Sequence, residues 1–160
     1  MGRLAAYPIR SLLTTAQRFM EDRWEAWFRA LLLSVNGAPY RVAHVTVTAG
    51  AAAIVAAVAY QTTPRVEAVY QVAMSLRISR ASSGTSSATW TLGWTAGGVA
   101  QAEALAALTG NTTTTQVNRM ITIRADPQTD ITYSVAYASV GATTMTYDLS
   151  VVVFQLPDAV

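Results

Sequence analysis

From Tyr40 onward, the chain alternates apolar and polar positions with a period of two, the pattern of half-buried β-strands. The clearest case is VEAVYQVAMSLRIS, where every even-numbered position from Val66 to Ile78 is apolar and most odd-numbered positions are polar. One face of this long strand is therefore expected to belong to a core. The same alternation predicts about eight strands, over 40–48, 52–60, 66–79, 88–95, 99–108, 115–125, 130–138 and 143–156.

The segments between these strands have turn chemistry, as in QTTPR, ASSGTSS and ADPQTD. Antiparallel strands joined this closely predict a two-sheet sandwich, and about eight of them make a jelly roll the leading topology. One segment is ambiguous. The residues VAQAEALAAL (99–108) include Ala, Glu and Leu, which favour helix, so we favour a strand here and keep a helix as the alternative.

A different period, of three to four residues, runs through PIRSLLTTAQRFMEDRWEAWFRALLLSV (8–35) and predicts an α-helix. Pro8 suits the first turn, and the Asn-Gly pair at 36–37 suits the end of the helix. Large apolar side chains occupy more than one face of this helix, so it needs partners. We therefore expect a mainly β protein with a helical stem at 1–37 and an eight-stranded antiparallel jelly-roll sandwich at 38–160.

Trp90 and Trp94 lie in SATWTLGWTAGG, a stretch without charge, and they fall on the same face of a predicted strand with Leu92 between them. Two aromatic side chains in this arrangement suit the core of a sandwich. A platform for a ligand and a subunit interface remain as alternatives.

The charge of the chain is sparse and gives little sign of a charged partner. All eleven basic residues are Arg, the net charge is only +2, and the Arg residues are scattered, so we expect no nucleic-acid partner. The absence of Lys excludes Schiff-base chemistry and a P-loop, and the absence of Cys excludes disulfides and thiolate sites. The most apolar stretch, AGAAAIVAAVAY (49–60), is too short to span a membrane, and the N-terminal segment is a poor signal peptide.

Few residues can carry chemistry. His44 is the only histidine, and we expect it on a strand near a surface or an interface. Asp126 and Asp130 flank the turn ADPQTD and are ordinary turn residues, with a calcium site as the weaker alternative because it would need more oxygen ligands. We therefore expect no enzyme activity, no cofactor and no bound metal.

The stretches TWTLGWTAGG (89–98) and MITIRADPQTDITYSVAYASVGATTMTYDLSVVVFQL (120–156) resemble a C-terminal module of bacteriophage short fibres and decoration proteins. In that module a Gly-Trp-Thr strand end and an Ile-Arg-Ala-Asp turn before an Ile-Thr-Tyr strand recur. The resemblance implies a tumour-necrosis-factor-like jelly roll that forms trimers below a helical stem. Three stems packed together would cover the residues expected at the trimer interface and anchor: Phe19, Trp24, Trp27, Phe28 and Leu31.

The function expected from the sequence is that of a structural protein of a bacteriophage virion, assembled in the cytoplasm of the host bacterium. It would be a homotrimeric short fibre, spike, or capsid or neck decoration that contacts other virion proteins. The alternative is a receptor-binding tip whose loops, such as 80–88 and 109–116, recognise a host surface glycan or protein with trimer avidity. A non-viral ligand of cytokine type is a third hypothesis, which the poor signal peptide disfavours.

Overall fold

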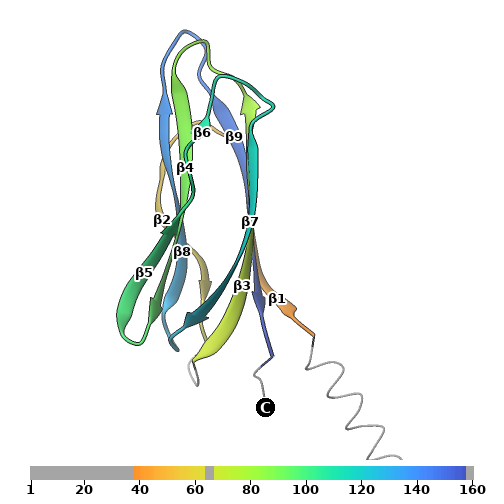
Figure 1. Ribbon diagram of the computed structural model, residues 1–160, viewed down its shortest axis with the longest axis vertical. Coiled ribbons are helices and arrows are strands. Elements are labelled where there is room, and N and C mark those ends of the chain that lie inside the picture. Colours follow the sequence, from red (N-terminus) through yellow and green to blue (C-terminus); the bar gives the residue numbers. More distant parts are fainter. Residues whose placement is uncertain (1–37, 64–66, 158–160) are drawn as a thin grey trace, which may run out of the picture. The chain divides into compact units, whose positions relative to one another are not determined.

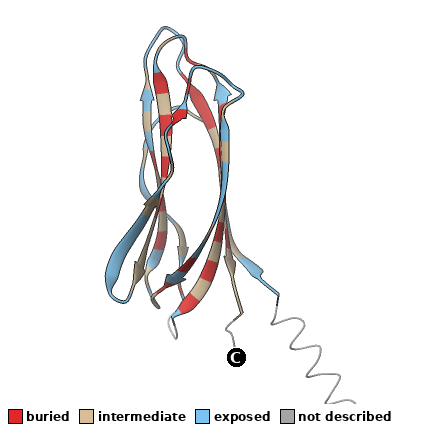
Figure 2. Ribbon diagram, in the orientation of Figure 1, coloured by how far each residue is buried: buried red, intermediate tan, exposed pale blue. Residues whose placement is uncertain are grey.

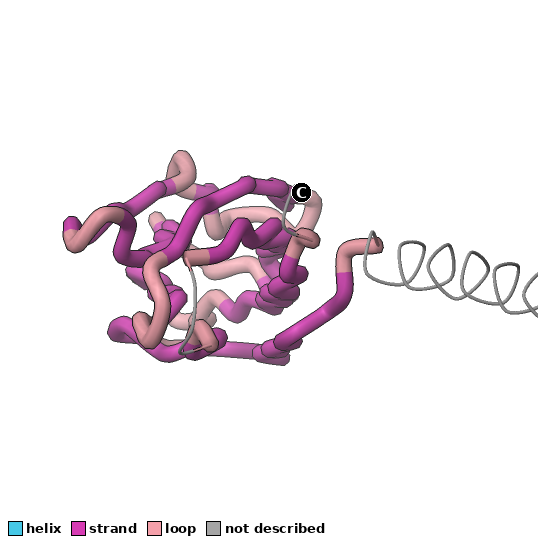
Figure 3. Tube along the Cα trace, turned by 90° about the horizontal axis from the view of Figure 1, so that it is seen from below, coloured by secondary structure: helices cyan, strands magenta, loops and turns pink. Residues whose placement is uncertain are grey.

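The computed structural model describes residues 38–63 and 67–157, which form two antiparallel β-sheets (Figure 1). Sheet A has the strand order β1 (Tyr40–Gly50), β9 (Thr146–Gln155), β3 (Ala68–Arg80) and β7 (Gln116–Ala125). Sheet B has the order β2 (Ile54–Gln61), β8 (Asp130–Ser139), β4 (Ser86–Ala96) and β5 (Val99–Ala104), and β6 (Leu108–Thr109) also pairs with β4. Strands and loops make up all of the described residues, with no helix among them (Figure 3).

The prediction of a mainly β, two-sheet sandwich is confirmed, and each predicted strand segment contains a strand. The number of strands was wrong, because the structure has nine rather than eight. The extra strand arises where the segment 99–108 is interrupted. Thr91 pairs with Ala104 but Ala88 pairs with Leu108, so one additional residue lies opposite β4 between the two pairs. The helical alternative for this segment is wrong.

The predicted helix at 8–35 and the stem at 1–37 lie outside the described residues. The helix and the division into a stem and a sandwich domain at residues 37 and 38 therefore stay predictions.

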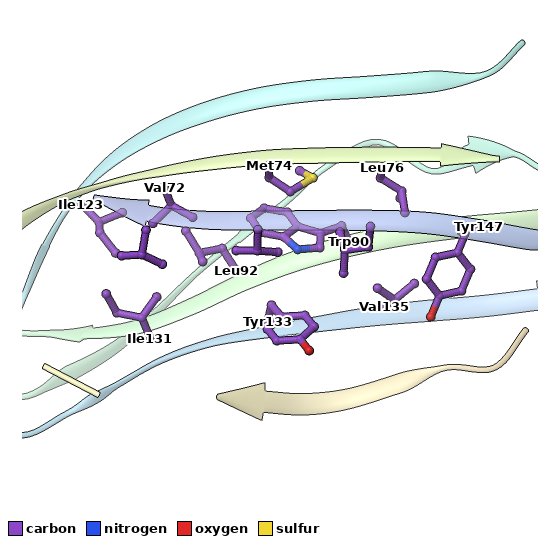
Figure 4. Packing of buried hydrophobic residues seen from close by; sticks show 14 of the residues in the cluster. Val72, Met74, Leu76, Trp90, Leu92, Ile123, Ile131, Tyr133, Val135 and Tyr147 are labelled. Carbon is purple, nitrogen blue, oxygen red and sulfur yellow. The ribbon is translucent and has the colours of Figure 1, made fainter. Parts of the chain in front are cut away.

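The core lies between the two sheets, and the alternation of the sequence determines which side chains enter it (Figure 2). In β3 the even-numbered positions from Ala68 to Ile78 are buried, whereas Gln71, Ala73 and Ser75 face away from the core. Figure 4 shows Trp90 between side chains of both sheets, including Met74 of β3 and Val135 of β8. Period-two burial on two facing sheets thus accounts for the inward-facing apolar positions of the described strands.

The two ends of the sandwich differ in what they carry (Figure 1). At one end lie the loops 81–85, 110–115 and 140–145, which we call the tip loops. At the opposite end β1 begins, β9 ends, and the turns β4–β5 and β7–β8 lie. The chain therefore enters the domain at the end opposite the tip loops.

Candidate functional site

The residues predicted to form the trimer interface and anchor are outside the described part of the chain. Phe19, Trp24, Trp27, Phe28 and Leu31 all belong to the segment 1–37, so their role stays a prediction.

The two tryptophans of the uncharged stretch differ in burial: Trp90 belongs to the core, and Trp94 lies beside it. Trp90 has 0% of its surface exposed, and Trp94 is half-buried and packs against the same core cluster. The prediction of core packing is confirmed for Trp90, which leaves no exposed face for a ligand to stack on. Its indole Nε1 has no hydrogen-bond partner, an unusual state for a buried donor that has consequences for stability.

His44 lies on the outer face of β1, as the sequence predicted for a surface or interface residue. Its Nε2 is 3.2 Å from the hydroxyl oxygen of Ser150 on β9, and both groups are exposed. Among residues 38–63 and 67–157 there is no group of three or more His, Asp or Glu side chains that could hold a metal ion. Within the same ranges, no helix is long and apolar enough to cross a membrane.

Asp126 stabilises a turn at the end of the sandwich opposite the tip loops. One carboxylate oxygen accepts the backbone N–H of Gly97 at 2.9 Å, and the other accepts that of Gly98 at 2.7 Å. Both glycines have positive φ angles, 59° and 74°, so the carboxylate stabilises a turn that needs glycine. Asp130, at the start of β8, is exposed. The oxygens of Asp126 are thus already engaged by the protein itself, which disfavours the calcium alternative.

A surface that the sequence analysis missed lies on the outside of sheet A. Three of its apolar side chains are cross-strand neighbours: Ala73 on β3 pairs with Met120 on β7 and with Val152 on β9. Phe154 is the next outward-facing residue of β9, opposite Gln71. Met120 is 59% exposed. We call Ala73, Met120, Val152 and Phe154 the outer apolar patch.

This patch borders a shallow depression in the sheet surface, with a volume of about 440 Å³. Three of the side chains that line the depression are small, Ala73 and Ser75 on β3 and Ser150 on β9, and Asn118 and Met120 line it along β7. A flat sheet face normally has no such hollow. Its lining combines apolar residues such as Met120 and Val152 with Asn118 and Arg119, which suits a protein contact better than a reaction, since no acid–base pair lines it.

An ion pair between Arg77 on β3 and Asp148 on β9 lies on the outer face of sheet A, next to this depression and toward the tip loops. Asp148 of β9 accepts two hydrogen bonds from the Arg77 guanidinium, at 2.9 and 2.7 Å. Its other oxygen accepts the backbone N–H of Ala49 at 2.8 Å. That backbone N–H, together with Arg77, holds the pKa of Asp148 below its ordinary value, although partial burial opposes the shift.

The tip loops are tied together by buried serine hydroxyls. Ser86 donates to Ser82 at 2.6 Å, and Ser82 donates to the carbonyl oxygen of Val140 at 3.0 Å. The backbone N–H of Gly110 donates to the carbonyl of Ser86 at 2.7 Å. The three tip loops therefore form one surface. Their residues, 81–85, 110–115 and 140–145, include no charged side chain.

The missed patch had a signal in the sequence. The run Val151, Val152, Val153 and Phe154 is continuously apolar, which is typical of a strand covered on both faces. Val151 and Val153 point into the core and are fully buried, whereas Val152 and Phe154 are only half-buried. The serine hydrogen bonds of the tip loops and the bonds of Asp126 to the glycine turn join segments that are far apart in the chain. No local sequence pattern predicts such contacts.

No protein-family model and no curated protein matches this chain. One solved structure with some similarity is a chain of the Bacillus endospore appendages, which are described as a family of disulfide-linked pili. It is 18% identical and covers 76% of this chain and 92% of that chain, with a TM-score of 0.33. A similarity at this level carries no argument about the fold or the function of this protein.

Proposed function

We propose that this protein is a structural component of a bacteriophage virion. It forms a homotrimeric short fibre, spike, or capsid or neck decoration, anchored to other virion proteins by the helical stem at 1–37. The sandwich domain at 38–160 is the head of this trimer, and the protein acts without catalysis or a cofactor.

The strand order supports a jelly roll for the head. Most successive strands alternate between the sheets, giving β1-β9-β3-β7 against β2-β8-β4-β5. Strands β5 and β6 both pair with β4, so they act as one interrupted edge strand, and eight principal strands remain. Two four-stranded antiparallel sheets linked in this way are the jelly-roll architecture. The resemblance of residues 89–98 and 120–156 to phage virion modules supports the same assignment.

The outer apolar patch is the observation that carries the proposal, because it indicates that sheet A packs against another molecule. Val152 and Phe154 are half-buried on the outer side of β9, an interior strand of sheet A, and Met120 in the same patch is 59% exposed. Contiguous apolar side chains on an outer face are typical of a protein contact. The outer face of four strands of about ten residues covers roughly 600 Å². This approaches the roughly 800 Å² that each partner buries in a stable interface. The described residues begin at 38 and lead directly into β1, a strand of the same sheet.

A variant pair tests this contact. Val152→Arg places a charge in the outer apolar patch and should shift the full chain from trimer to monomer in sedimentation velocity. The matched control, Thr91→Arg, lies on the outer face of sheet B and should remain trimeric. Circular dichroism must show the same β signal for both variants. A Val152→Arg protein that is folded and fully trimeric would remove the main support for the proposal.

The virion location needs a separate test. Mass spectrometry of purified particles, produced by a bacterium that carries the gene, should detect the protein at a copy number divisible by three. Absence from intact particles, with abundant protein in the lysate, would contradict a structural role in the virion.

A receptor-binding tip is the second candidate function, and the tip loops favour it. They form a single, internally bonded surface at the end of the head opposite the point where the chain enters it. A fixed surface of this kind loses little entropy when it binds. Fluorescently labelled trimer should then bind host cells, and Thr113→Trp or Thr143→Trp, both at exposed loop positions, should abolish that binding without changing the mass of the trimer. If neither variant affects cell binding, the tip loops are not the receptor site.

A further inference from the structure

A second depression, of about 290 Å³, lies on the outer face of sheet A beside the first one. None of the four residues of the outer apolar patch lines it, and the two depressions share only Ser75 and Ser150. Most of its lining side chains form hydrogen bonds. We call this depression the polar hollow, and its hydrogen-bonding residues are Thr46, Thr48, Ser75, Arg77, Asp148 and Ser150.

Three hydroxyl groups of the polar hollow lie side by side across three strands. Ser150 of β9 pairs with Thr46 of β1 on one side and with Ser75 of β3 on the other. Neighbouring strands are about 4.8 Å apart, so the three hydroxyls extend over roughly 10 Å of the surface. Each hydroxyl donates one hydrogen bond and also accepts. The row can therefore exchange several hydrogen bonds with one flat ligand that carries hydroxyl groups of its own.

The ion pair next to this row provides polar groups in a fixed position. Arg77 donates to one oxygen of Asp148 through two of its five N–H groups, at 2.9 and 2.7 Å. The backbone N–H of Ala49 holds the other oxygen at 2.8 Å. The Arg77 side chain is 62% exposed, so its other N–H groups are open to a ligand. Because the pair is already ordered, little conformational entropy is lost when a ligand binds to it.

The charges of the polar hollow indicate a neutral ligand. The positive charge of Arg77 is compensated by Asp148, and the other hydrogen-bonding side chains are uncharged. An anion would meet the Asp148 carboxylate beside the guanidinium, and a metal ion would find only one carboxylate among the lining residues. We propose that the polar hollow binds one sugar unit of a neutral saccharide through its hydroxyl groups.

This inference goes beyond the proposed trimer and does not depend on it. It also differs from the receptor-binding alternative, because the ligand lies on the face of sheet A rather than on the tip loops. A sugar ring would accept hydrogen bonds from Arg77 and exchange them with the hydroxyls of Ser75 and Ser150. The polar hollow is open, so a bound ring buries mainly one face. We therefore expect weak binding, with a dissociation constant on the order of 1 mM for a single sugar unit.

Saturation-transfer NMR on the full chain tests the inference, because it detects weak binding to a protein of any mass. The probes are the methyl glycosides of glucose, galactose, mannose and N-acetylglucosamine, with methyl glucuronide as the charged comparison. Ser75→Val fills part of the polar hollow with a residue that favours strands. Thr46→Val is a second variant on another strand. The matched control, Ser134→Val, changes the outer face of sheet B, where Ser134 pairs with Thr91.

At least one neutral glycoside should bind the wild type and Ser134→Val equally, and should bind Ser75→Val or Thr46→Val about tenfold more weakly. Circular dichroism must show the same β signal for the variants that are compared. Three results would overturn the inference: no saturation transfer to any neutral glycoside at millimolar concentration, binding of the glucuronide alone, or binding that both hollow variants retain in full. Light scattering measures the mass of the same samples, so a failure of the saccharide site and a failure of the trimer are distinguishable.

Discussion

Replacing Trp90 tests how the core is held together, because this side chain is fully buried and its indole nitrogen donates no hydrogen bond. Trp90→Ala removes the largest fully buried side chain of the described residues. Truncations of this kind typically cost about 3–5 kcal/mol. That is a large share of the roughly 5–15 kcal/mol that stabilises a domain, so the melting temperature should fall sharply.

Trp90→Phe should behave differently. Phenylalanine is smaller by about 40 Å³, and at about 24 cal/mol per Å³ the cavity costs close to 1 kcal/mol, with a similar loss of transfer free energy. Against this loss, the substitution removes a buried N–H without a partner, whose desolvation costs about 1–3 kcal/mol. The two effects nearly cancel, and we expect the free energy of unfolding to change by less than about 1 kcal/mol.

Urea unfolding followed by far-UV circular dichroism measures both variants, at one protein concentration because assembly stabilises the folded state. Fluorescence is less suitable, since Trp90 is itself a probe. Trp94→Phe, at a half-buried position, is the matched control. Two results would refute the reasoning: a Trp90→Ala protein as stable as the wild type, or a Trp90→Phe protein as unstable as Trp90→Ala. If Trp90→Ala does not fold, Trp90→Leu can take its place.

Three further predictions concern the turns and the outer face of sheet A. Asp126→Ala removes the acceptor of both glycine N–H groups and should lower the free energy of unfolding by about 1–2 kcal/mol. Asp126→Asn should be intermediate, and urea unfolding measures both variants. No loss in either variant would contradict the role of this carboxylate. A side chain at Gly110 would overlap the sulfur of Met145, so Gly110→Ala should lower the free energy of unfolding by about 1–3 kcal/mol in the same assay. An unchanged midpoint of urea unfolding would mean that the tip loops rearrange to accommodate the added methyl group. Because the pKa of Asp148 is lowered in the folded state, its ionised form contributes stability above its unfolded pKa and loses it as the pH falls through the folded pKa. The wild type should therefore lose its advantage over Asp148→Asn on acidification below about pH 4, and a constant difference in melting temperature from about pH 7 to pH 3 would show that Asp148 makes no such contribution.

The strands could be predicted because two facing sheets impose alternating burial directly on the sequence. In β3, for example, every even position from Tyr70 to Ile78 is buried, as the period of two requires. The interruption of 99–108 could not be predicted, since it depends on how Ala104 and Leu108 pair with β4. The position of the extra residue is set by the pairing with β4 and is not visible in the sequence of 99–108 alone.

The candidate surfaces were harder to predict than the fold. The apolar run from Val151 to Phe154 signals a strand covered on both faces, but it does not say what covers it. Likewise, the hydroxyls of Thr46, Ser75 and Ser150 become neighbours only through the pairing of β9 with β1 and β3. Both features depend on the order of strands, which follows from pairings between segments far apart in the chain.

The mass of the full-length protein in solution tests the central claim most directly. Multi-angle light scattering during size-exclusion chromatography, at micromolar concentration, should give three times the 17.1 kDa of the chain. The outer apolar patch would then be covered by neighbouring subunits. A mass equal to one chain, from a protein that retains its β-type circular dichroism, would contradict the trimer and the function proposed from it.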